Sequence, residues 1–127
     1  MKPERNQCLV RKGNPGERFF VVCLLMLLNE KTAHGYELAE NLSYFGFETD
    51  EINLSTIYRN LRKMEEDCLV TSFWQEGEQG PQKRVYEITD RGKKELEFWT
   101  EMLKKRKTRI EKLLARFDQQ NTKHKGD

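Results

Sequence analysis

The sequence predicts a mainly α-helical fold with one small β-hairpin and a long C-terminal helix. Three patterns carry this prediction. Residues 19–28 form a continuous apolar run, and residues 53–64 repeat apolar side chains at helical spacing. Residues 69–75 and 84–89 have the composition of two strands joined by a glycine-rich connection. A chain of 127 residues can bury one modest core, so we expect a single domain.

The N-terminal part of the chain predicts an arm, a buried helix and a short second helix. Residues 1–16 contain several glycine and proline breakers and are expected to be flexible. The run of residues 19–28 is apolar nearly all round, which indicates a helix that is buried on most sides. At ten residues it is too short to span a bilayer. A turn follows, in which Thr32 can cap a helix that directs Leu38 and Leu42 inward.

Residues 53–64 predict an amphipathic helix, capped by Asn53 or Ser55, with a basic outer face. The apolar stripe consists of Leu54, Ile57, Leu61 and Met64. The outer face consists of Ser55, Thr56, Arg59, Asn60, Arg62 and Lys63. Such a face suits a DNA major groove, where Arg reads guanine, Asn reads adenine and hydroxyl groups bind phosphate. The alternative is an ordinary solvated helix face.

The two strand-like segments complete a winged helix-turn-helix. A short helix, a turn and a helix with a polar face form the helix-turn-helix order, and a hairpin directly after them is a wing. Lys83 and Arg84 lie at the rim of this hairpin, where a wing touches phosphate or the minor groove. A surface hairpin that binds no ligand is the alternative.

The last helix is predicted to be longer than the core can cover. Its apolar residues occupy heptad a and d positions, interrupted once at Arg106, and the simplest partner is the same helix of a second copy. Thr89 or Asp90 can cap its start. The predicted dimerisation residues are Leu96, Trp99, Leu103, Ile110, Leu113 and Phe117. The expected organisation is a flexible arm (1–16), a winged helix-turn-helix (17–90), a dimerisation helix (91–117) and a disordered tail (118–127).

Charge is sorted along the chain, although the net charge is only +2. Residues 1–18 carry five positive and two negative side chains, and residues 91–116 carry ten and four. Residues 19–52 carry one positive and six negative side chains. This sorting is expected if some faces meet DNA and others do not.

The sequence shows no arrangement of residues that is typical of an enzyme or of a metal site. The sequence has no phosphate-binding glycine loop, and its two histidines, His34 and His124, fall in a turn and in the tail. Three widely spaced cysteines, Cys8, Cys23 and Cys68, argue against a zinc site or a disulfide framework and favour a reducing cytoplasm. We therefore expect a cytoplasmic protein that is not an enzyme and holds no metal or cofactor.

Several segments together resemble the PadR family of bacterial transcriptional regulators, over residues 17–117. The matching segments are His34-Gly35-Tyr36-Glu37-Leu38, Ser55-Thr56-Ile57-Tyr58-Arg59-Asn60-Leu61, Met64-Glu65, Leu69-Val70, Gly80-Pro81-Gln82-Lys83-Arg84-Val85-Tyr86, Ile88-Thr89, Gly92 and Phe98-Trp99. Phe45-Gly46-Phe47-Glu48, followed by Ile52-Asn53, also resembles the polyhydroxybutyrate-responsive branch. The chain departs from the family at Cys68, where glycine is usual; a positive φ there would strain a cysteine.

The resemblance implies a homodimeric DNA-binding repressor that dimerises through its first and last helices, and some members release DNA on binding a small molecule. The DNA contacts it implies are Ser55, Thr56, Tyr58, Arg59, Lys63, Lys83 and Arg84. Trp99 lies where some relatives bind flat aromatic compounds between subunits, and Phe19 is the second candidate for contact with an aromatic or apolar effector. The alternative for Trp99 is packing in the dimer core, which is the commoner role of an aromatic residue at helical spacing.

The predicted function is a dimeric, sequence-specific transcriptional regulator of a near-palindromic operator. Its partners would be double-stranded DNA, a second copy of the chain and a small effector, with no membrane involved. The alternative from another class is a winged-helix module that binds protein and not DNA. Affinity for DNA that is absent or barely depends on salt would favour this alternative.

Overall fold

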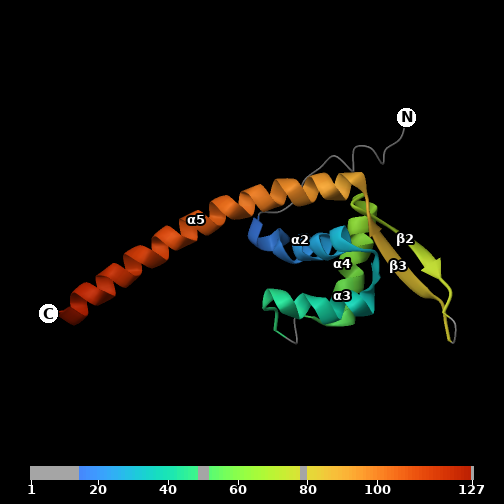
Figure 1. The fold of residues 1–127 in the computed structure, drawn as a ribbon, viewed down its shortest axis with the longest axis horizontal. Helices are drawn as coiled ribbons and strands as arrows, with labels where there is room; N and C mark the ends of the chain where they lie inside the picture. The colour runs from blue at the N-terminus through green and yellow to red at the C-terminus, as the bar shows by residue number, and fades with distance from the viewer. Residues whose placement is uncertain (1–14, 49–51, 78–79, 127) are drawn as a thin grey trace.

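The computed structural model describes residues 15–48, 52–77 and 80–126. It confirms the predicted fold class, a mostly helical winged helix-turn-helix with a long C-terminal helix (Figure 1). The elements in chain order are α2 (Pro15–Glu30), β1 (Ala33–His34), α3 (Gly35–Leu42), the 3-10 turn η1 (Ser43–Phe45), α4 (Leu54–Glu66), β2 (Val70–Gln75), β3 (Lys83–Ile88) and α5 (Asp90–Gly126). The predicted flexible arm, residues 1–16, falls mostly outside the described residues.

The core is built around α2, as its apolar sequence predicted. Leu24 and Leu25 are 0% exposed, and α5 covers α2 from one side while α3 lies on the other (Figure 1). Cys23, also on α2, is a buried free thiol whose pKa is raised to about 12 by burial. This thiol is therefore a small core side chain and stays protonated at neutral pH.

The sheet has three antiparallel strands in the order β1-β3-β2, one more than the sequence predicted. The wing pairs Val70 with Ile88 at one end and Gln75 with Lys83 at the other. The additional strand, β1, pairs with the other edge of β3. The hairpin is thereby anchored to the start of α3, on the side away from β2.

The start of α3 corrects one predicted cap. His34, and not Thr32, is the N-cap residue: its Nδ1 accepts a hydrogen bond from the Glu37 backbone N–H at 3.4 Å. The Glu37 side chain in turn accepts from the His34 backbone N–H at 3.1 Å. These two bonds form a capping box, which satisfies two backbone donors at the helix start.

The junction of α4 and β2 has the geometry that glycine usually provides. Cys68 has a φ of 66°. Its backbone N–H donates to the Glu65 carbonyl at 3.1 Å, and the Leu69 N–H donates to the Met64 carbonyl at 2.9 Å. This pair of bonds is a Schellman motif, so the helix ends in a conformation that usually takes glycine, despite the cysteine. The sulfur of Cys68 is in a disulfide bond, which the sequence did not predict. Cys8 lies outside the described residues.

Helix α5 begins at a threonine cap and continues far beyond the core. Thr89 Oγ1 accepts from the Gly92 backbone N–H at 3.0 Å and donates to the Cys68 carbonyl at 2.7 Å. The helix then runs to Gly126, so the predicted disordered tail of residues 118–127 is corrected for residues 118–126. No helix in the described part of the chain combines the length and the apolarity that crossing a membrane requires.

Candidate nucleic-acid interface

The predicted recognition helix is α4, and its start is capped as expected. Asn53 Oδ1 accepts a hydrogen bond from the Thr56 backbone N–H at 2.8 Å. The apolar face is anchored because Ile57, Leu61 and Met64 are at most 1% exposed. This burial fixes which side of the helix remains for a ligand. The exposed residues of that side are Ser55, Arg59, Arg62, Lys63 and Glu66, with Thr56 half-buried beside them.

Tyr58 lies at the border between the buried and exposed faces of α4. Its ring is half-buried and lies directly over the first residue of α3. A Cβ atom on Gly35 would come within 2.5 to 2.7 Å of three atoms of this ring. The glycine in the His34-Gly35-Tyr36 motif therefore permits the close approach of the two helices of the helix-turn-helix.

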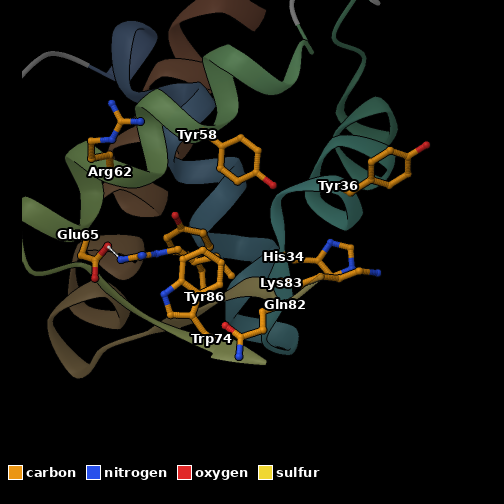
Figure 2. Close-up of a pocket in the computed structure, with 10 residues that line it drawn as sticks. His34, Tyr36, Tyr58, Arg62, Glu65, Trp74, Gln82, Lys83 and Tyr86 are labelled. Carbon is orange, nitrogen blue, oxygen red and sulfur yellow. Dashed lines mark ion pairs between the residues drawn. The ribbon is translucent and has the colours of Figure 1, made fainter. Parts of the chain in front are cut away.

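A groove of about 850 Å³ separates α4 from the wing (Figure 2). Tyr58 and Arg62 line it from α4, Lys83 lines it from β3, and His34 and Tyr36 line it from the start of α3. The remaining lining residues are Glu65, Trp74, Gln82, Arg84 and Tyr86. Tyr58, Lys83 and Arg84 were predicted DNA contacts. Arg62 was predicted on the outer face of α4 but not among the DNA contacts, and His34 and Tyr36 were assigned to neither.

The sequence held a signal for only one of those missed groove residues. Arg62 follows Tyr58 by four residues, so both lie on the same edge of α4. His34 and Tyr36 reach the groove through the pairing of β1 with β3, which no local pattern reveals. Tyr86 forms part of the groove wall, and its pKa is raised chiefly by burial, which keeps the phenol neutral.

Arg84 is held by other side chains of the same chain. Its Nε donates to Ser72 Oγ at 3.0 Å, and a terminal nitrogen lies 3.7 Å from Glu65 Oε1. Ser72 Oγ donates in turn to Glu65 Oε2 at 2.8 Å. The guanidinium carbon also lies 5.2 Å from the ring centroid of Trp74, within the range of a cation–π contact. The predicted DNA contact at Arg84 thus has internal partners for its Nε–H, for one terminal nitrogen and for its flat face.

The family follows from the comparison with known proteins. Residues 24–98 match the transcriptional regulator PadR-like family, which is more than half of the chain. The chain belongs to the PadR-like family. Because this is a family of transcriptional regulators, the prediction of a regulator that is not an enzyme is confirmed.

Solved structures and a curated relative agree with this assignment. A PadR-like transcriptional regulator from Bacillus cereus is 28% identical, with a TM-score of 0.64, over 73% of this chain and 88% of that one. Bacillus subtilis PadR in complex with operator DNA is 29% identical, with a TM-score of 0.54, over 65% and 47%. A probable transcriptional regulator of Mycobacterium tuberculosis is 39% identical over 82 residues. That alignment covers 60% of this chain and 40% of the relative. None of these three matches addresses the polyhydroxybutyrate-responsive branch, which stays a prediction.

Two residues of the predicted dimer and effector sites lie inside the core of this PadR-like protein. Leu96 is 6% exposed and Trp99 is 4% exposed. The indole N–H of Trp99 donates to Glu95 Oε2 at 2.9 Å, so its polar group is already satisfied. The structure of one chain therefore gives Leu96 and Trp99 a packing role. Phe19, the other effector candidate, is 37% exposed and lies 5.7 Å from Phe47 between ring centroids.

The remaining predicted dimerisation residues lie progressively farther from the core. Leu103 is half-buried against it, whereas Ile110, Leu113 and Phe117 are 47%, 66% and 55% exposed. Leu114 is also exposed, and these four last residues recur at i, i+3, i+4 and i+7. They form one apolar stripe on the part of α5 that extends beyond the rest of the PadR-like fold (Figure 1).

Proposed function

We propose that this chain is a dimeric, sequence-specific DNA-binding repressor that a small-molecule effector releases from a near-palindromic operator. The observation that carries the DNA-binding part is the outer face of α4, where Arg59, Arg62 and Lys63 lie on an exposed side whose back is locked into the core. Membership of the PadR-like family supports the same function, as does the likeness to Bacillus subtilis PadR in complex with operator DNA.

The candidate side chains have two kinds of role in this proposal, base reading and contact with the sugar-phosphate backbone. Arg59 reads a base edge, because it is exposed near the centre of the outer face and can donate two hydrogen bonds to guanine. The others position the protein on the sugar-phosphate backbone, which carries no sequence information. The proposed backbone contacts are Ser55, Thr56, the Tyr58 hydroxyl, Arg62, Lys63 and Lys83.

Two copies would place their α4 helices in successive major grooves, roughly 34 Å apart. The second copy is argued from α5, since a helix with four exposed apolar residues in one stripe is best stabilised by a partner helix. The effector would act by changing this spacing. We propose that the effector binds at Phe19 in the assembled dimer, because Trp99 is buried and hydrogen-bonded within one chain.

The test is selection of bound fragments from the source genome, followed by titration of the best fragment at two salt concentrations. We expect a near-palindromic fragment that binds far more tightly than random DNA, with an affinity that falls as salt rises. The variant to compare with wild type is a double substitution, Arg59→Ala with Lys63→Ala, which removes two proposed DNA contacts and keeps the buried face of α4 intact.

Two results would decide against this proposal. Failure of the selection to enrich any fragment, with binding to DNA absent or independent of salt, would favour the protein-binding module instead. Equal binding of the double variant and the wild type to the selected fragment would place the DNA contacts away from α4.

A further inference from the structure

The recognition helix and both strands of the wing are joined to each other through side chains. Glu65 lies in the last turn of α4, Ser72 on β2 and Arg84 on β3. Two hydrogen bonds, Ser72–Glu65 (2.8 Å) and Arg84–Ser72 (3.0 Å), and the Arg84–Glu65 ion pair (3.7 Å) form a closed triangle. We call these three residues the clamp.

The sheet register explains why Arg84 reaches this position. Trp74 is the direct cross-strand partner of Arg84, and Ser72 is two residues farther along β2, on the same face. The Trp74 ring can therefore support the guanidinium while Ser72 receives its Nε–H. Each contact constrains a different part of the Arg84 side chain. Together they fix the orientation of the guanidinium group and also pair its charge.

Two other positively charged side chains of the same groove have a different environment from that of Arg84. Arg62 on α4 and Lys83 on β3 line it without an acidic partner within the described part of the chain. A DNA phosphate would meet these two cations without having to displace a carboxylate. At Arg84 a phosphate would instead compete with Glu65, which already faces the guanidinium at 3.7 Å.

We propose that Arg84 is a positioning residue, which acts through Glu65 and Ser72 to hold the wing at a fixed distance from the recognition helix. The proposal rests on the proposed DNA-binding function. The clamp sets the width of the groove between Arg62 and Lys83, so that cations from α4 and from the wing reach the same stretch of backbone together. Without it, the described part of the hairpin would be tied to α4 through the backbone junction at Cys68 and through packing.

The sharpest test replaces Glu65 by glutamine. Removing a negative charge beside DNA should, by electrostatics alone, leave affinity unchanged or raise it. Loss of the clamp predicts the opposite sign: operator affinity falls about tenfold in Glu65→Gln. The matched control is Glu66→Gln, which removes the same charge from the next residue, an exposed one outside the clamp.

A second variant separates positioning from phosphate contact. Arg84→Lys keeps the charge that a phosphate needs but loses the Nε donor and the planar group over Trp74. We expect Arg84→Lys to lose about tenfold in operator affinity, with a salt dependence like that of wild type. Retained affinity in Arg84→Lys, or an equal response of Glu65→Gln and Glu66→Gln, would overturn the proposal.

A measurement without DNA distinguishes failure of this inference from failure of the proposed function. The indole N–H resonance of Trp74 should shift in both Glu65→Gln and Arg84→Lys and stay in place in Glu66→Gln. If no DNA binds to wild type, the function fails, and the Trp74 resonance still reports whether the clamp links α4 to the wing. An unmoved resonance in both clamp variants would overturn the clamp itself.

Discussion

The Tyr58 ring occupies the space that any side chain at position 35 would need. We expect Gly35→Ala to destabilise the protein by about 1–3 kcal/mol, because the added methyl group would force the ring out of its place. Denaturant unfolding measures the change. Tyr58→Ala alone should also destabilise, but the double variant should lose less than the sum of the two, since the clash is then absent. Additive losses would contradict the proposed packing.

Cys68 is held in a left-handed conformation that an L-residue adopts at a cost. Replacing it by glycine should stabilise the fold by about 0.5–1 kcal/mol, because the relief of strain exceeds the larger backbone entropy of glycine in the unfolded chain. The comparison requires reducing buffer, so that the disulfide of Cys68 plays no part. Cys68→Ala, which keeps a Cβ atom, is the control and should give no such gain.

Arg59 is the residue on which sequence discrimination is proposed to depend. Arg59→Ala should cost about 1–3 kcal/mol on the selected operator and much less on random DNA of the same length. Lys94→Ala, an exposed charge change on the first part of α5, is the control. Equal losses on both DNAs would make Arg59 a phosphate contact.

At the scale of single residues, the sequence predicts where a side chain lies better than it predicts which other side chains it contacts. Helical spacing correctly placed Arg59 and Lys63 on the exposed face of α4. It could not show that Arg84 is held by Glu65 and Ser72, because these residues come together only when the sheet register brings β3 beside β2 and the end of α4. The same limit applies to Trp99, whose heptad position is shared by core and dimer residues.

Among the elements, α5 depends on a cap that also joins it to the wing. We expect Thr89→Val to destabilise the fold by about 1–2 kcal/mol, because the variant leaves the Gly92 N–H and the Cys68 carbonyl without their side-chain partner. Thermal or denaturant unfolding measures the loss. Thr89→Ser keeps both hydrogen bonds and should retain most of the stability; an equal loss in the two variants would show that these hydrogen bonds are not the source of the effect.

The elements that the sequence missed are those fixed by tertiary contact. The long helices and the hairpin were predicted because each carries its own periodicity. A two-residue strand has none, and β1 exists only because Ala33 and His34 pair with β3. The capping role of His34 escaped notice for a related reason: Thr32 is a commoner cap type, and only the strand sets which residue stands at the helix start.

At the scale of the whole molecule, the proposed DNA-binding surface and the proposed dimerisation surface lie in separate parts of the chain. The recognition helix and the wing form one end of the folded body, and the outer part of α5 extends away from that body with its apolar stripe exposed (Figure 1). This separation lets assembly be disrupted without altering the surface proposed to touch DNA. Residues 118–126 are helical although most of them are polar, because they continue a helix that begins against the core.

A double variant, Leu113→Lys with Phe117→Lys, should therefore convert the proposed dimer into a monomer. Both residues are more than half exposed within one chain, so the protomer should keep its fold. Sedimentation measures the association. Operator affinity should fall by about 100-fold or more, because the second half-site is no longer bound intramolecularly, whereas affinity for one half-site should stay close to that of wild type.

Thr108→Lys is the matched control, because it adds a lysine to the opposite side of the same exposed part of α5. It should leave both association and operator affinity near the wild-type values. If the double variant instead remains dimeric, the stripe is not the assembly surface, and the second copy must bind elsewhere. If it becomes monomeric and yet binds the full operator as tightly as wild type, each chain recognises its site alone and the near-palindrome is not required.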